Sequence, residues 1–112
     1  MSLINYGYTE DLSNIPNHSN GPLDRYVFNS LKHNFILHEF KDVNNSIKYC
    51  DKHSHIENES LLLVGDIIME LYLNGNTLEI KSPCYIHIDS NIEHSINIIN
   101  GTGSLVIIKS ED

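Results

Sequence analysis

The sequence predicts an all-β fold in a single domain. From Arg25 onward the chain divides into short runs rich in β-branched and aromatic residues, with turn-forming Asn and Gly between them. No segment carries a sustained apolar stripe with the 3.6-residue period of an amphipathic helix. Because 112 residues are too few for two hydrophobic cores, we expect one domain with one principal site.

The pattern indicates roughly nine strands. The runs are RYVF (25–28), NFILHEF (34–40), SIKYC (46–50), SLLLV (60–64), DIIMELYL (66–73), TLEI (77–80), CYIHI (84–88), HSINII (94–99) and SLVIIK (104–109). Tight turns are expected at Asn44-Asn45, Asn74-Gly75 and Asn100-Gly101, because Asn and Gly tolerate the positive φ angles that close hairpins. Periodicity alone leaves a sandwich, a barrel and a jelly roll open.

The segment before these runs differs in character. Residues 1–24 are rich in Asn, Ser, Gly and Pro and have no sustained periodicity, so we expect an irregular N-terminal arm followed by a β-domain over residues 25–112. The first residues do not have the pattern of a secretory signal, and no stretch is long and apolar enough to span a membrane. We therefore expect a cytoplasmic protein with no membrane partner.

Composition excludes some partners and bonds. The net charge is −8 and Arg25 is the sole arginine, which argues against nucleic acid because neutralising phosphates requires clustered cations. Cys50 and Cys84 are far apart and form no C-x-x-C pair. We expect reduced thiols rather than a disulfide or a thiolate zinc site.

Three histidines and a glutamate indicate a metal site. His53 and His55 are separated by one residue, so in a strand their side chains share a face and their Cα atoms lie about 6.6 Å apart. Glu59 opens the next strand, and His94 opens another after a turn-like break. An H-x-H pair alone is more often a half-exposed pair, but two further ligand types favour a site for one Fe, Mn, Ni, Co or Zn ion with open coordination positions.

Two segments resemble the motifs of the cupin superfamily. HSHIENE is similar to the first motif, H-x-H followed after three or four residues by Glu, and NIEHSIN is similar to the end of the second. The resemblance covers residues 47–97. It implies a cupin-type jelly-roll β-barrel in which His53, His55, Glu59 and His94 bind one metal ion, and small cupins often pair as homodimers.

The residues around the ligands depart from these motifs. Ile47 stands where the first motif begins with Gly, and Gly65 comes one residue early. In the second motif Pro83-Cys84 replaces Gly-Asp, Asp89 replaces Pro, and Asn91 replaces Gly. Asn or Pro can replace glycine at a turn when it adopts the required backbone, whereas a lost ligand abolishes a site.

Further residues are candidates for lining the pocket. In a regular strand Tyr49 and Asp51 share the face of His53, which makes them the first candidates for acid–base catalysis, although Tyr49 also fits an aromatic core residue and Asp51 a solvated one. His38 and Glu39 lie on opposite faces of one strand, and the sequence leaves open which points inward. Parity also predicts an apolar wall from Leu61, Leu63, Ile86 and Ile88.

The leading functional hypothesis is a metal-dependent enzyme acting on a small polar metabolite such as a sugar derivative. The ion would stabilise an enediolate-like charge during isomerase- or lyase-type proton transfer. The alternatives are a non-haem Fe(II) dioxygenase and a non-catalytic metal- or ligand-binding module.

Overall fold

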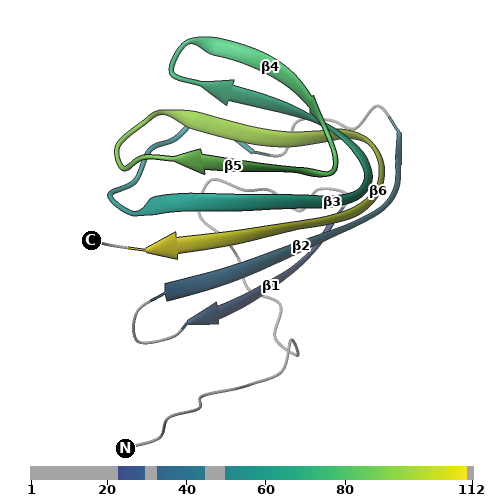
Figure 1. Ribbon diagram of the computed structural model, residues 1–112, viewed down its shortest axis with the longest axis horizontal. Helices are drawn as coiled ribbons and strands as arrows, with labels where there is room; N and C mark the ends of the chain where they lie inside the picture. The colour runs from purple at the N-terminus through teal and green to yellow at the C-terminus, as the bar shows by residue number, and fades with distance from the viewer. Residues whose placement is uncertain (1–22, 30–32, 45–49, 111–112) are drawn as a thin grey trace, which may run out of the picture.

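The computed structural model describes residues 23–29, 33–44 and 50–110, which form a single antiparallel sheet (Figure 1). The strands are β1 (Leu23–Asn29), β2 (His33–Asn44), β3 (Asn58–Leu73), β4 (Asn76–Lys81), β5 (Cys84–Ile88) and β6 (His94–Ser110). Their order is β1-β2-β6-β3-β4, and β5 also pairs with β3. The described ranges contain strands and no helix, so the all-β prediction is confirmed, and none of them offers a helix able to cross a membrane.

Two long strands form the frame of the sheet. β3 and β6 pair from one end to the other, and β3 uses its first half to pair with β5 and its second half to pair with β4. In Figure 1 the strands β2, β3 and β6 curve together at one side, so the sheet wraps around its inner face. Within the described residues the edge strands β1 and β4 do not pair with each other, so the sheet is not closed into a barrel.

Glycines permit the close approach of β3 and β6 where they curve. Gly65 is the register partner of Gly103, and Gly101 is the partner of Ile67. Gly101 has a φ of 116°, and a Cβ at this position would overlap the carbonyl oxygen of Asp66 and lie 2.9 Å from the Cα of Ile67. The two backbones are therefore too close for a side chain at position 101.

A β-bulge in β6 keeps apolar side chains inward on both sides of this bend. The register with β3 shifts between Ile68 and Met69, which leaves one extra residue in β6. Before the bulge the even-numbered residues His94 and Ile96 point inward. After it an odd-numbered residue, Leu105, points inward, because the extra residue shifts the alternation by one. The large apolar side chains that are less than 2% exposed are Leu63, Ile67, Met69, Leu71, Ile98 and Leu105.

The structure merges several of the expected strands. The runs 60–64 and 66–73 are one strand, β3, and the runs 94–99 and 104–109 are one strand, β6. The predicted hairpin at Asn100-Gly101 is therefore wrong, because these residues lie inside β6 at the bend. The hairpin at Asn74-Gly75 is confirmed, with φ angles of 44° and 95° between β3 and β4. Most of the expected arm (residues 1–22) and most of run 46–50 lie outside the described residues, so the arm stays a prediction, while its last two residues, Leu23 and Asp24, belong to β1.

Two alanine substitutions test the close approach at the bend. Both Gly101 and Gly75 have positive φ, but a Cβ at Gly75 meets nothing within 4 Å. We expect Gly75→Ala to lower the free energy of unfolding by about 1 kcal/mol through backbone strain alone. Gly101→Ala adds a steric clash and should cost about 3 kcal/mol or more. Urea unfolding followed by circular dichroism measures both, and equal losses would contradict the packing argument.

Candidate metal centre

The backbone brings His53 and His94 face to face. The amide of His53 donates to the carbonyl of His94 at 2.9 Å, and the amide of His94 donates back at 2.8 Å. These two bonds form an isolated antiparallel bridge, in which paired residues have Cα atoms about 5.5 Å apart and side chains on the same face. The imidazole centroids are accordingly 4.5 Å apart.

Side-chain and main-chain bonds hold the segment that carries His53 and His55. Asn97 on β6 is buried, and its amide side chain accepts from Cys50 N at 2.9 Å and donates to Cys50 O at 3.2 Å. Further along, Asn91 N donates to His55 O at 2.8 Å. Asn91 has a φ of 62°, so it adopts the left-handed conformation for which the cupin motif uses glycine. The segment is thus attached to β6 at one end and to the β5–β6 turn at the other.

Glu59 reaches the same point from β3. It is the first of the inward-facing side chains on this strand and is 3% exposed. Its Oε2 lies 2.9 Å from Nε2 of His94 and 3.5 Å from Nε2 of His55. The carboxylate therefore meets the histidines deep in the fold rather than at the surface.

Main-chain carbonyls fix the orientation of all three imidazoles. In each ring Nδ1 lies within hydrogen-bond distance of a backbone oxygen, and since that oxygen can only accept, Nδ1 must donate. A neutral ring held in this way carries its lone pair on Nε2. The distances from Nδ1 to the oxygen are 2.7 Å from His53 to Asp51, 3.1 Å from His55 to Glu57, and 2.9 Å from His94 to Ile92.

The resulting lone pairs converge without a donor between them. Nε2 of His55, Nε2 of His94 and Oε2 of Glu59 are buried, and among the described residues none of them has a hydrogen-bond partner of acceptable geometry. Facing lone pairs repel unless a cation lies between them. Ligand atoms 2.1 Å from an ion and at right angles to each other are about 3.0 Å apart, close to the spacing observed here.

The donor set fits a divalent transition metal. His53, His55 and His94 each offer one nitrogen, and these three atoms lie within 4.8 Å of one another. Three imidazoles can therefore hold a metal ion, with Glu59 placed to add a carboxylate oxygen. Imidazole with carboxylate is a donor set suited to Fe, Mn, Co, Ni or Zn.

Electrostatics within the cluster follow the same geometry. Burial acts to raise the pKa of Glu59, but its close contacts with the imidazoles of His55 and His94 outweigh burial and hold that pKa well below its ordinary value. Burial acts to lower the pKa of His94, but the Glu59 carboxylate outweighs it and raises the pKa. Burial lowers the pKa of His53. Glu59 is thus a carboxylate near neutral pH, and a proton on His94 or a metal ion balances its charge.

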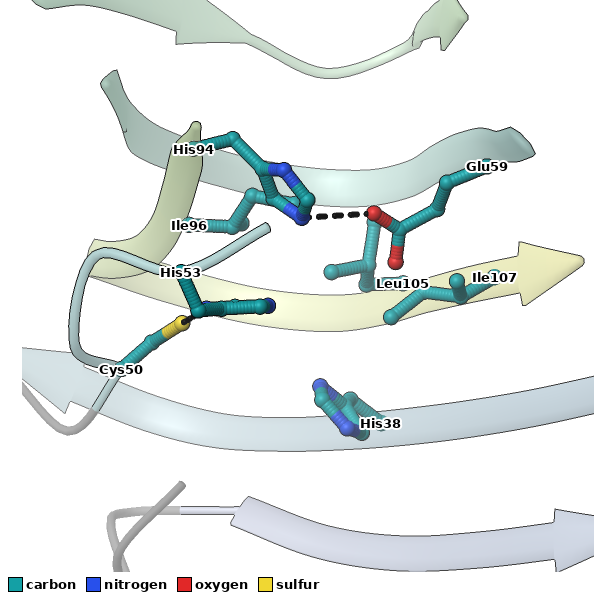
Figure 2. Close-up of a pocket in the computed structure, with 8 residues that line it drawn as sticks. All are labelled: His38, Cys50, His53, Glu59, His94, Ile96, Leu105 and Ile107. Carbon is teal, nitrogen blue, oxygen red and sulfur yellow. Dashed lines mark hydrogen bonds and ion pairs between the residues drawn. The ribbon is translucent and has the colours of Figure 1, made fainter. Parts of the chain in front are cut away.

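A small pocket opens beside the cluster (Figure 2). Its free volume is about 10 Å³, which is room for one group of the size of a water molecule. The lining residues are His38, Cys50, His53, Glu59, His94, Ile96, Leu105 and Ile107. Burial raises the pKa of the Cys50 thiol to about 11, so the thiol remains protonated near neutral pH.

The structure answers the question of which face of β2 points inward. His38 is 2% exposed and lines the pocket, whereas Glu39 is exposed. Figure 2 shows His38 on the opposite side of the pocket from His94 and Glu59. Sequence parity identified His38 and Glu39 as alternatives, and the direction could not be chosen because the bulges that set the phase of the sheet have no clear sequence signal.

The other residues that were expected to line the pocket either lie outside the described part of the chain or do not line the pocket in the structure. Tyr49 lies outside the described residues, so its role stays a prediction. Asp51 has an exposed side chain that does not line the pocket, because the chain from residue 51 to 57 is not a regular strand and parity does not apply. Cys50 lines the pocket instead, and sequence reasoning missed both this and the contact of Asn97 with Cys50. Leu61, Leu63 and Ile88 are buried as expected and Ile86 is half-buried, but they lie in the core rather than along the pocket.

Comparison with known proteins identifies the fold. No family model matches the sequence, and no curated protein matches it. Solved structures do match, including an RmlC-like cupin from Shewanella frigidimarina with a TM-score of 0.67 and 12% identity, covering 100% of this chain and 93% of that one. KdgF from Halomonas sp. matches with a TM-score of 0.66 and 11% identity, covering 92% and 89%.

The polyketide cyclase RemF from Streptomyces resistomycificus matches with a TM-score of 0.64 and 13% identity, covering 98% of this chain and 81% of that one. Each of these three alignments spans most of both chains, so the similarity extends to the whole wrapped sheet and is not confined to one hairpin. The predicted fold class is therefore confirmed, and the protein has a cupin-like jelly-roll fold.

Proposed function

We propose that the protein binds a single divalent transition-metal ion and is a metal-dependent enzyme that catalyses isomerase- or lyase-type proton transfer on a small polar metabolite. The observation that carries this proposal is the convergence of buried lone pairs from His55, His94 and Glu59, with no donor between them in the described part of the chain. Such an arrangement is costly in an empty protein interior and favourable around a cation.

The charge of the site supports this chemistry. An ion of charge +2 beside one carboxylate leaves a net charge of about +1, which attracts an oxygen atom that carries or develops negative charge. When bound, the ion supplies Lewis acidity toward a carbonyl or hydroxyl oxygen. Ile96, Leu105 and Ile107 give the same pocket an apolar wall, and a low local dielectric strengthens the electrostatic contacts inside it.

The surrounding charge favours a neutral or weakly anionic substrate. The chain has a net charge of −8, and Arg25, its sole arginine, is 4% exposed on β1. An arginine buried in the sheet is not displayed as a surface clamp for a multiply phosphorylated molecule. The name of RemF, a polyketide cyclase, supports a catalytic role for this fold but does not specify the reaction of this chain.

Metal content tests the site directly. Protein purified without chelators should contain about one transition-metal ion per chain by elemental analysis, and His53→Ala or His94→Ala should remove most of it, because each deletes a converging nitrogen. His87→Ala is the matched control, since His87 is an exposed histidine on β5 whose ring contacts Ser60 and Asp89 instead. Full metal content in both ligand variants would refute the site.

Catalysis is tested by hydrogen exchange. In deuterium oxide, metal-loaded protein should catalyse exchange of the carbon-bound proton next to the carbonyl in members of a panel of small hydroxyaldehydes and hydroxyketones, measured by proton NMR. Chelation or His94→Ala should reduce the exchange to the uncatalysed rate, because both remove the positive charge that stabilises the enediolate. Metal-dependent binding of a panel member without any exchange would instead indicate the non-catalytic module.

A non-haem Fe(II) dioxygenase is the second candidate. The observation that favours it is the small free volume beside the apolar side chains of Ile96, Leu105 and Ile107, which suits a diatomic molecule better than a sugar. An oxygen electrode separates the two candidates. Substrate-dependent oxygen uptake with Fe(II), and none with Zn(II), would favour the dioxygenase, whereas exchange supported by several divalent ions would favour proton transfer.

A further inference from the structure

The pocket beside the metal centre has one further polar side chain that faces it from another strand. The described lining residues comprise converging ligands, three aliphatic side chains, the protonated thiol of Cys50, and His38. His38 comes from β2. The other two histidines that line the pocket, His94 and His53, come from β6 and from the segment before β3. A neutral imidazole contains one nitrogen-bound hydrogen and one nitrogen lone pair, so its chemistry allows it both to donate and to accept a hydrogen bond.

His38 is not part of the ligand cluster. The nitrogens within 4.8 Å of one another belong to His53, His55 and His94. Figure 2 places His38 across the pocket from His94 and Glu59, with Leu105 and Ile107 between them. On one side the His38 ring packs edge-on against Phe40, with the ring centroids 6.2 Å apart. Phe40 is buried, so the imidazole has an apolar neighbour on its own strand.

The space between His38 and the ligand cluster is the size of one small group. The pocket that His38, His53, Glu59 and His94 line together has a free volume of about 10 Å³, enough for a single oxygen atom with its hydrogens. An oxygen atom in this space has the cation site on one side and the His38 ring on the other. The aliphatic neighbours Ile96, Leu105 and Ile107 cannot form a hydrogen bond with it.

We propose that His38 is the hydrogen-bonding residue for the oxygen atom of the ligand that occupies this pocket, and that it selects small oxygen donors such as carboxylates, enolates and hydroxyls. The inference rests on the proposed metal centre and adds the residue that recognises the ligand from the opposite wall. His38 acts by holding and orienting that oxygen. An apolar ligand, or one with no oxygen at this point, makes no hydrogen bond with the His38 imidazole and binds more weakly.

Ligand binding to cobalt-loaded protein tests the role of His38 without measuring turnover. Co(II) in an imidazole and carboxylate site absorbs visible light, so a titration with formate gives a dissociation constant from the spectral change. We expect His38→Phe to raise the dissociation constant for formate about tenfold, the effect of one lost hydrogen bond. His38→Gln keeps a donor amide and should stay within about threefold of the wild type.

Cobalt content separates this inference from the proposed metal site. Wild type, His38→Phe and His38→Gln should each bind about one cobalt ion, and the outward-facing control His87→Phe should match wild type in cobalt and formate binding. If His38→Phe does not fold, His38→Leu removes the ring hydrogen bond without adding bulk. Unchanged formate affinity in the apolar variants, or loss of cobalt from them while wild type retains it, would overturn the role of His38 and leave the metal site standing. A wild type that binds no cobalt would refute the metal site and, with it, this inference.

Discussion

The confinement of several lone pairs in one buried volume is the constraint on which the site depends. Polar atoms lose hydration on burial, and they normally recover it through hydrogen bonds within the protein. Here the nitrogens of His55 and His94 and an oxygen of Glu59 meet with no donor supplied by the described chain. A proton shared between His94 and Glu59 relieves part of the repulsion, but a divalent ion satisfies all of the ligands at once. The arrangement of these buried atoms therefore favours the binding of a cation.

The frame that maintains this convergence is the bend in β3 and β6. Glu59 lies in the first half of β3, whereas His94 is the register partner of Leu73 at the opposite end of that strand. The two would be far apart in a flat sheet, because residues in a strand rise about 3.3 Å each. Gly65, Gly101 and Gly103 let the paired strands turn sharply enough to bring the two ends together. The bulge in β6 then keeps both His94 and the later core residues inward.

Some of this organisation was readable from the sequence. The strand-forming runs, the Asn74-Gly75 hairpin and the candidate ligands follow from local residue types and spacing, which sequence displays directly. The fold class could also be predicted, because the resemblance of the ligand pattern to the cupin motifs favoured the jelly roll among the architectures that strand periodicity leaves open. Asn91 adopts the left-handed backbone that the motif assigns to glycine, as turn chemistry allows.

Other features depended on contacts between distant segments. Asn100-Gly101 has the local signature of a tight turn, but the packing of β6 against β3 makes it the crowded inside of a bend. The bulge reverses parity by one residue, so no pattern within β6 could fix which of its later side chains point inward. The orientation of Asp51 depends on such a contact too, because Asn97, 47 residues away from Cys50, bonds to the segment before His53.

The imidazole orientations have a consequence for how such a protein can change over evolutionary time. Each Nδ1 hydrogen bonds to the main-chain oxygen of a residue two positions away, at Asp51, Glu57 and Ile92. Every amino acid supplies the same carbonyl, so side chains at these three positions can be exchanged without disturbing which ring nitrogen faces the centre. The course of the backbone, rather than the neighbouring side chains, therefore determines the orientation of the three imidazoles. A lineage can therefore replace most of the residues around its histidines and keep the same arrangement of ligands.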